Sequence, residues 1–480
     1  MKIIAVWPDP RPEVGIFFDV LKKKGHDIVY WVSDNNTQQF CPPGAIFHNH
    51  YEAWNGNPAP AYANTHIPPI SERDVEKFYE VESISLTMMN KGYDTEPVDS
   101  RKHTYYSMLA YWTFVLDVHK PDAIIYNTLP HTVYNYVLYE LARARGIRTV
   151  LFDNAWFVGR LLPYEDIWNG STPLKKALAQ NLLKDTGVED LDDVSRGYYE
   201  RQTIPSLWET PSYMKDQRAV AEGAGLWRHR LRVAAKTLRH GTFFQLASDY
   251  VKRAFKKNLR DEYLSLQKIP DLSVPFVYFP LSHQPERTTS PQGGVYHDQI
   301  LVAETVAAAL PEGWKLYIKE HPSQWWRRSK TRFSSVRYPG YYERLARIPG
   351  VTLVPISTDS LILTNASRTT ATVTGTAGWE ALLRGKSPLV FGFVWYGDCP
   401  GVTHVTSVDD CKHAFAEISK VPVRDMSKGV FAFLKALMHA SVPAYTEDPG
   451  DPLVPVISSE QSLRTLATTI DGLLRGKELA

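Results

Sequence analysis

Two series of alternating strand-like and helix-like segments constrain the fold of this chain more than any other feature. The first series has apolar strand-like runs and helical patterns at 3–6, 14–24, 28–32, 123–126, 132–145 and 149–152. Strands that alternate with helices form a parallel sheet with helices on both faces. We therefore expect an α/β chain with an N-terminal Rossmann-like, doubly wound domain at residues 1–155.

The second series begins near residue 274 and predicts a C-terminal domain of the same kind at 273–480. Its expected strands are 276–279, 315–319, 351–354, 371–373 and 389–391, and its expected helices are 299–309, 360–365, 378–384 and 459–474. Between the two series, residues 156–272 show charged helical patterns and predict a helical insertion or linker. Two Rossmann-like domains predict a central ligand cleft, because ligands bind beyond the carboxyl ends of parallel strands.

Composition excludes several classes of protein. A hydrophobic fraction of 44% with 22% charged residues is typical of a soluble globular protein, and a net charge of +2 argues against a surface built for nucleic acid. The three cysteines, Cys41, Cys399 and Cys411, have no metal-ligand spacing and favour a reduced cytoplasm. The apolar run at the N-terminus is too short for a signal peptide or a membrane span, so we expect a cytoplasmic protein.

A basic stretch at 214–260 leaves one membrane-related hypothesis open. Twelve Lys and Arg residues there outnumber Asp216, Glu222 and Asp249, and aromatic residues such as Trp227 and Phe255 are interleaved with them. A basic amphipathic surface could lie on an anionic leaflet, which predicts peripheral contact with the inner face of the plasma membrane. The alternative interpretation is a solvated helical face whose aromatic side chains turn to the core.

A glycine-rich turn is the most informative local motif. It directly follows an expected strand, opens a helix and reads Thr374-Gly375-Thr376-Ala377-Gly378-Trp379-Glu380. Glycines let a backbone approach a ligand closely, and hydroxyls and helix N-terminal amides favour an anion such as a nucleotide phosphate. A tight strand-to-helix turn without a ligand is the structural alternative.

Two further polar segments follow expected strands of the second series. The first is Lys319-Glu320-His321-Pro322, in which the proline restricts His321 to an extended backbone at the strand end. Its imidazole could donate a charge-assisted hydrogen bond to phosphate, although a lone histidine is often structural. The second is the polar loop 283–294, which includes Glu286. Such a loop at a strand end is typical of a binding cleft, and a hydrogen-bonded surface turn is its alternative.

Polar residues also follow strands of the first series. They are Asn127 to His131, Asp153 and Asn154, with Asp9 and Glu13 in the first strand-to-helix loop. We interpret them as candidate groups on the side of a sugar acceptor. For each one, helix capping or another structural role is an alternative.

Together these motifs resemble the capsule polysaccharide biosynthesis family. The segments that carry the resemblance are Gln284-Pro285-Glu286-Arg287-Thr288-Thr289, Lys319-Glu320-His321-Pro322, Thr374 to Glu380, Gly385-Lys386-Ser387-Pro388 and Phe391-Gly392. The family includes Kdo transferases and is similar in outline to bacterial sialyltransferases. The resemblance implies a GT-B fold and a CMP-activated sugar donor. It also implies that His321 and Pro322 bind the CMP phosphate together with the hydroxyls of Thr374 and Thr376.

The resulting hypothesis is a nucleotide-sugar-dependent glycosyltransferase of bacterial capsule or surface polysaccharide biosynthesis, with a glycan or lipid-linked glycan as acceptor. The expected nucleotide-binding residues are His321, Lys319, Thr374, Gly375, Thr376 and Glu380. The expected catalytic residues are Glu286, Asp153 and His131. A cationic His321 could neutralise the leaving phosphate, so no metal or cofactor is expected. Three alternatives remain open: a nucleotide-sugar epimerase, a polyol-phosphate transferase, and an inactive scaffold of the capsule assembly complex.

Overall fold

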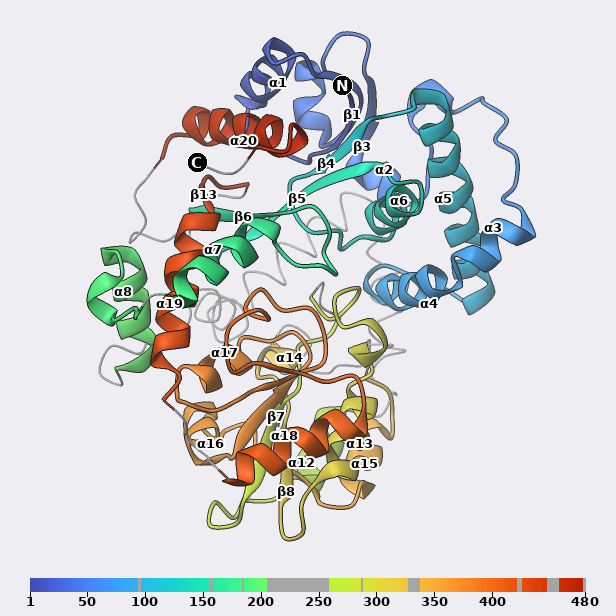
Figure 1. Cartoon of the computed structure of the whole chain (residues 1–480). Coiled ribbons are helices and arrows are strands. Elements are labelled where there is room, and N and C mark those ends of the chain that lie inside the picture. The colour runs from blue at the N-terminus through green and yellow to red at the C-terminus, as the bar shows by residue number, and fades with distance from the viewer. Residues whose placement is uncertain are drawn as a thin grey trace, which may run out of the picture. The chain divides into compact units, whose positions relative to one another are not determined.

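The computed structural model of the chain forms two compact units (Figure 1). Unit 1 comprises Met1–Tyr199, Asp398–Pro400 and Ser427–Ala480, and unit 2 comprises Glu200–Gly397 and Gly401–Met426. The structure describes residues 1–93, 96–155, 159–183, 185–204, 259–285, 288–326, 337–420, 425–446 and 457–477.

Unit 1 contains a seven-stranded sheet in the order β13-β6-β5-β4-β1-β2-β3. The strands β1 to β5 are parallel, and β6 and β13 extend the sheet through antiparallel pairs. The strands are β1 (Lys2–Val6), β2 (Asp27–Ser33), β3 (Ile46–Asn49), β4 (Ala123–Tyr126), β5 (Arg148–Asn154), β6 (Arg160–Tyr164) and β13 (Val442–Pro443). The helices are α1 (Val14–Lys23), α2 (His50–Trp54), α3 (Glu72–Lys77), α4 (Tyr79–Met88), α5 (Val98–His119), α6 (Val133–Ala144), α7 (Thr172–Leu182), α19 (Ser427–Ala440) and α20 (Ser459–Leu474), while α8 (Asp193–Thr203) crosses the boundary between the units.

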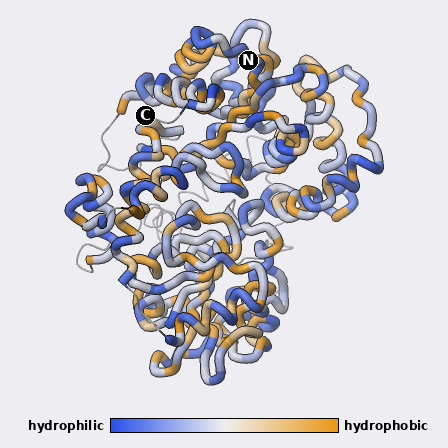
Figure 2. The backbone as a smooth tube through the Cα atoms, viewed as in Figure 1, coloured by the Kyte–Doolittle hydropathy of each residue, from blue (hydrophilic) through white to orange (hydrophobic). Residues whose placement is uncertain are grey.

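Neighbouring residues of β2 show how both faces of this sheet are buried. Successive side chains of a strand point to opposite faces. Trp31 packs edge to face on Phe18 of α1, with ring centroids 4.8 Å apart, on the face that α20 also covers. Tyr30 packs on Trp112 of α5 on the other face, at 5.8 Å. Figure 2 shows the hydrophobic stretches of the central strands and the alternation of hydrophilic and hydrophobic residues along α20.

Unit 2 contains a six-stranded sheet in the order β12-β11-β10-β7-β8-β9, in which every strand pair is parallel. The strands are β7 (Phe276–Pro280), β8 (Lys315–Lys319), β9 (Val351–Leu353), β10 (Thr369–Thr372), β11 (Leu389–Val390) and β12 (Thr403–His404). The helices are α12 (Leu259–Leu266), α13 (Gln299–Ala309), α14 (Ser323–Trp326), α15 (Tyr341–Arg347), α16 (Ser360–Ala366), α17 (Ala377–Leu382) and α18 (Val408–Lys420). The larger core lies on the face that α13, α15 and α18 cover, and a smaller one includes Leu363 of α16.

The expected α/β fold class is confirmed, because each unit is built around a mainly parallel sheet with helices on both faces. The bounds of β4, β8, α13 and α20 are those predicted from the sequence. The strand predicted at 371–373 lies at Thr369–Thr372 instead. The short strands β3, β6, β12 and β13 and the helices α4, α5, α18 and α19 were not predicted.

The division of the chain differs from the expected domains 1–155, 156–272 and 273–480. Unit 1 continues to Tyr199, and the last segment, Ser427–Ala480, belongs to unit 1 and not to unit 2. The physical reason is that the apolar face of α20, including Leu463, Leu466 and Ile470, is buried in the core of unit 1 with α1. Residues 156–158, 184 and 205–258 of the expected helical insertion lie outside the described residues, and the described part of it includes α7, α8 and α12.

Two findings concern the membrane hypothesis. Residues 205–258, which include most of the basic stretch, lie outside the described residues. Among the helices that the structure describes, none combines the length and the apolar character that a membrane span requires.

Candidate functional site

The sheet of unit 2 has a switch point between β7 and β10. From β7 the chain adds β8 and β9 on one side, and from β10 it adds β11 and β12 on the other. In such sheets the loops that leave the two central strands diverge, and ligands bind beyond the carboxyl ends of the strands at this point. The three predicted motifs follow β7, β8 and β10, so the topology brings them to one edge of the sheet.

The loop after β7 contacts the loops after β10 and β11. Gln292 accepts a hydrogen bond from the backbone N–H of Phe393 at 2.9 Å, and Gly392 donates its own N–H to the carbonyl of Val373 at 2.9 Å. A Cβ atom at Gly392 would lie 2.7 Å from the Gln292 carbonyl oxygen and 2.9 Å from Thr374 Cγ2. This close approach explains the glycine of the Phe391-Gly392 motif.

The same loop is tied to the loop after β8 by two reciprocal hydrogen bonds. The backbone N–H of Gln284 donates to Gln324 Oε1 at 2.9 Å, and Gln324 Nε2 donates to the Gln284 carbonyl at 3.1 Å. The Gln284 amide also donates to the hydroxyl of Thr289 within the loop. These hydrogen bonds therefore link the described segments of all three motifs at the sheet edge.

The glycine turn after β10 is held by specific polar contacts. The N–H of Gly375 donates to Thr372 Oγ1 at 2.9 Å, and the Tyr396 hydroxyl donates to the Gly375 carbonyl at 2.7 Å. A Cβ atom at Gly378 would lie 2.3 Å from the Tyr396 hydroxyl oxygen, so only glycine fits there. The Thr374 hydroxyl is buried and has no hydrogen-bond partner in the described part of the chain.

Glu380 of α17, the last residue of the glycine motif, lies one helical turn after Thr376. Burial raises the pKa of this carboxyl, whereas the Arg384 charge and a hydrogen bond from the Thr376 side chain act against that shift. Thr376 and Glu380 are therefore in contact, as their four-residue spacing on a helical segment allows.

His321 lies directly beyond the end of β8 with its ring in a defined orientation. Its Nδ1 accepts the backbone N–H of Ser323 at 3.2 Å, and its own backbone N–H donates to Glu320 Oε1 at 2.7 Å. In the neutral imidazole the proton is consequently on Nε2. The ring also packs against that of His283 at the end of β7, with centroids 5.8 Å apart.

The ammonium of Lys319 contacts the loop between β9 and α16. It donates to the Thr358 carbonyl at 2.6 Å and to Ser360 Oγ at 2.7 Å, so it holds this loop. Burial lowers the pKa of Lys319 to about 8. Lys386 also uses its buried ammonium to hold a loop, because it donates to the carbonyls of Asn365 and Ser367 at the end of α16.

The catalytic candidates of unit 1 lie at the carboxyl ends of the adjacent strands β4 and β5. His131 Nδ1 donates to the Leu129 carbonyl at 2.9 Å, and Asp153 Oδ1 accepts the N–H of Asn154 at 2.9 Å. Asp9 is buried and accepts two hydrogen bonds from the Arg11 side chain, at 2.8 and 2.6 Å, so its carboxylate has a structural partner. Glu286 lies outside the described residues.

Sequence reasoning missed Arg337, which forms a buried ion pair with Glu320 beside His321. The available signal was Glu320, a carboxylate inside the Lys319 to Pro322 motif. A partner 17 residues further along the chain has no helical or strand spacing that would reveal it.

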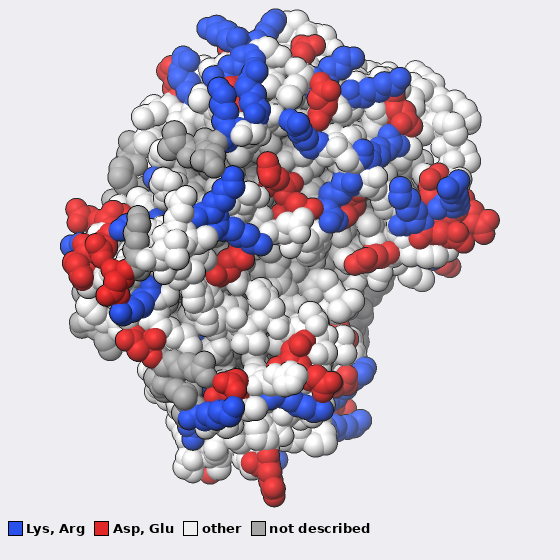
Figure 3. All heavy atoms as spheres, in the orientation of Figure 1, with Lys and Arg blue, Asp and Glu red and all other residues white. Residues whose placement is uncertain are grey.

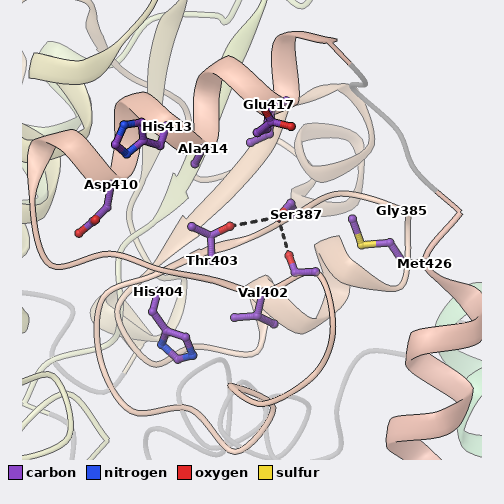
Figure 4. Close-up of a pocket in the computed structure, with 12 residues that line it drawn as sticks. Gly385, Ser387, Val402, Thr403, His404, Asp410, His413, Ala414, Glu417 and Met426 are labelled. Atoms are coloured by element: carbon purple, nitrogen blue, oxygen red, sulfur yellow. Dashed lines mark hydrogen bonds between the residues drawn. The ribbon is translucent and has the colours of Figure 1, made fainter. Parts of the chain in front are cut away.

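A hollow of about 410 Å³ in unit 2 lies apart from these motifs. Figure 4 shows His413 and Asp410 of α18 together with Ser387 and Thr403 at its wall. Asp410 accepts hydrogen bonds from Thr406 and Ser407, which lower the pKa of its carboxyl to about 2. None of the predicted nucleotide-binding residues lines this hollow, and in the described ranges no group of three or more metal-binding side chains is present.

The two sheets define the fold class of this protein. Two doubly wound α/β units in one chain are the architecture of the GT-B type. Residues 287–442 match the model of a family described as "Capsule polysaccharide biosynthesis protein", which confirms the resemblance expected from the motifs. This range contains His321 and the whole glycine turn.

Comparison with curated proteins gives no match. Among solved structures, similarity is found to the KpsC beta Kdo 2,7 transferase of Thermosulfurimonas dismutans, with 11% identity, a TM-score of 0.35, and coverage of 75% of this chain and 88% of that chain. The UDP-GlcNAc 2-epimerase of Methanocaldococcus jannaschii, in complex with UDP-GlcNAc and UDP, has 10% identity, a TM-score of 0.27, and coverage of 89% and 97%. The calicheamicin glycosyltransferase CalG4 has 11% identity, a TM-score of 0.24, and coverage of 92% and 94%.

Proposed function

We propose that this protein is a glycosyltransferase of capsule or surface polysaccharide biosynthesis. It transfers a sugar from a nucleotide donor, CMP-linked in our proposal, to a glycan or lipid-linked glycan. The observation that carries the proposal is the joining of the His321, Gln284 and Thr374 loops at the switch point of unit 2. A site of this kind is where parallel α/β sheets bind nucleotides.

The proposed role of His321 is to bind the donor phosphate. Because Ser323 donates to Nδ1, we assign the phosphate contact to the N–H at Nε2. A hydrogen bond from the imidazole N–H to a charged phosphate contributes roughly 1.5–3 kcal/mol. The same bond stabilises the charge that develops on the phosphate as the sugar leaves.

The glycine turn and α17 supply the rest of the proposed donor site. The buried Thr374 hydroxyl needs a partner, and a phosphate oxygen would provide one after a small local shift. Thr376 and Gly375 line the same turn. Glu380 would accept hydrogen bonds from sugar or ribose hydroxyls. We assign Lys319 to holding the loop before α16, because its ammonium already donates to Thr358 and Ser360.

The acceptor side of the proposal rests on unit 1. Asp153 and His131 are the described candidates for the group that deprotonates the acceptor hydroxyl, and Glu286 remains a third candidate from its place in the motif. A carboxylate or imidazole can act as such a base if it lies within hydrogen-bond reach of the hydroxyl.

Peripheral contact with an anionic membrane is part of the proposal, because lipid-linked acceptors lie at the inner leaflet. In the described part of the chain, Lys22, Lys23, Arg475 and Lys477 are exposed near the ends of α1 and α20. Figure 3 shows Lys and Arg gathered over these helices. Each such charge contributes about 1 kcal/mol near an anionic surface, and salt weakens the attraction.

The proposal is tested by measuring release of free CMP from CMP-activated sugars, with the lipid-linked acceptor in anionic vesicles and at low and high salt. We expect release only when the acceptor is present, with a lower rate at high salt. Release without any acceptor, or none with any combination of donor and glycan, would contradict transfer. Conversion of the nucleotide sugar without acceptor would favour an epimerase, and tight nucleotide binding without turnover would favour the scaffold.

A further inference from the structure

A fully buried ion pair lies next to His321. The side chains of Glu320 and Arg337 are 0% and 1% exposed. Arg337 Nε donates to Glu320 Oε2 at 2.9 Å, and its Nη2 approaches Oε1 at 3.4 Å, so the two groups meet in a bidentate arrangement.

Each end of this pair has further hydrogen bonds. Arg337 Nη2 donates to the Ser282 carbonyl at 3.1 Å, at the start of the β7 loop. Arg337 Nη1 donates to the Tyr341 hydroxyl at 3.1 Å, and the guanidinium lies 4.6 Å from the centroid of the same ring. On the other side, the Tyr342 hydroxyl donates to Glu320 Oε2. Arg337 therefore connects the ends of β7 and β8 with α15.

A contribution to stability does not by itself account for this buried ion pair. Removing two charges from water costs several kcal/mol per ion, and apolar residues of similar volume are often as stable or more stable. A bidentate pair, in contrast, fixes the position and the angle of both groups. The geometry therefore favours a positional role.

The group that this pair positions is His321. Glu320 Oε1 accepts the backbone N–H of His321 at 2.7 Å, so the carboxylate that Arg337 holds also holds the histidine backbone. The next turn of the chain then brings the Ser323 N–H to Nδ1 of the imidazole. Arg337, Glu320 and His321 form a continuous chain of contacts from α15 to the imidazole.

We propose that Arg337 is a positioning residue that acts through Glu320 to orient the imidazole of His321 toward the phosphate of the nucleotide donor. The phosphate contact itself rests on the function proposed above, whereas the orientation of the ring does not. The two parts can therefore be tested separately.

The orientation is tested without a ligand by nitrogen NMR of the histidine side chains, in which a His321→Asn variant assigns the His321 signal. At a pH where His321 is neutral, the unmodified protein should show the tautomer with the proton on Nε2. A variant that carries Arg337→Met and Glu320→Gln removes both charges, and we expect it to show a mixture of tautomers. An unchanged His321 signal in this folded variant would overturn the inference.

The phosphate contact is tested by a double-mutant cycle with CMP and the phosphate-free probe cytidine. Arg337→Met should weaken CMP binding about tenfold and leave cytidine binding unchanged. In a His321→Ala background, the same change should have no further effect, because its influence passes through the imidazole. Additive losses, or an equal loss for cytidine, would overturn the inference.

Two further variants complete the design. Arg344→Met removes an exposed arginine of α15 that pairs with Glu304, and it should change neither measurement. Tyr342→Phe removes the hydroxyl that donates to Glu320 and leaves both charges of the pair, so it serves if Arg337→Met does not fold, and it should act in the same direction with a smaller effect. If no nucleotide binds the unmodified protein, the proposed function fails while the NMR result still decides the role of Arg337.

Discussion

Gly378 illustrates how a single residue determines the local structure of the site. The Tyr396 hydroxyl that holds Gly375 by its carbonyl occupies the space that a side chain at Gly378 would fill. The absence of a side chain at Gly378 therefore leaves room for the Tyr396 hydroxyl. That hydroxyl in turn fixes the backbone of Gly375. Sequence reasoning recognised both glycines but not the tyrosine behind them.

We predict that Gly378→Ala destabilises the protein by about 1–3 kcal/mol, because the new Cβ would lie 2.3 Å from the hydroxyl oxygen of Tyr396. Adding Tyr396→Phe should recover part of the loss by removing that oxygen. Chemical denaturation measures both effects. As a control, Gly472→Ala in α20 should stabilise slightly, since its Cβ would have no neighbour closer than 4.0 Å. Equal losses for the single and double variants would contradict the steric explanation.

The sequence predicted that His321 and the glycine turn lie at one edge of the sheet, because both directly follow expected strands. The sequence could not show which groups the Lys319 ammonium contacts, because Thr358 and Ser360 come from the next strand-to-helix loop. The ion pair of Arg337 could not be predicted either, because a buried pair across a loop leaves no periodic pattern in the sequence.

At the scale of a secondary-structure element, α20 shows which contacts hold a helix in place. It packs along α1, and its buried Asp471 accepts hydrogen bonds from His26 Nε2 at 2.9 Å and from Arg475 Nε at 2.6 Å. Burial alone would raise the pKa of Asp471, but the bonds from Arg475 and His26 outweigh it and lower the pKa to about 2.

We predict that Asp471→Asn lowers the free energy of unfolding by about 2 kcal/mol at neutral pH, because it leaves the buried imidazole of His26 and the half-exposed guanidinium of Arg475 without their charged partner. The pKa of Asp471 is lower in the folded than in the unfolded chain, so its contribution is complete above about pH 4 and is lost as the pH falls toward 2. The difference between the two proteins should therefore shrink over that range.

Denaturation curves at several pH values provide the measurement. Glu460→Gln is a matched control on the same helix, because its pair with Arg464 is exposed and should contribute under 0.5 kcal/mol. A difference between Asp471→Asn and the parent that stayed constant down to pH 2 would refute the assignment.

The elements most accurately predicted are those with a clear pattern and clear ends. Helix α13 begins after Asp298, whose side chain accepts the N–H of Ile300, and α20 begins after Ser458, whose side chain accepts the N–H of Gln461. Helix α5 was missed although its buried residues between Tyr105 and Leu116 have helical spacing, because apolar residues outside that stripe, such as the exposed Val118, weaken the contrast between its two faces. The strands β12 and β13 have two residues each, too few for an alternating pattern.

At the scale of the whole molecule, the alternating pattern predicted two parallel sheets but not the course of the chain between them. The segments Asp398–Pro400 and Ser427–Ala480 return to unit 1 after most of unit 2 is complete. Which core a helix joins depends on the shape and apolar area of the surface it meets, and its own sequence does not specify that surface.

The central claim is that the sheet edge of unit 2 binds the phosphate of a nucleotide through His321. Isothermal titration with CMP, CDP and UDP measures it directly, with His413→Ala, an exposed histidine of α18, as the control. We predict that His321→Ala weakens nucleotide binding by roughly 10- to 100-fold at unchanged thermal stability, while His413→Ala binds as the parent does. Equal affinity of the parent and His321→Ala for every nucleotide would contradict the claim.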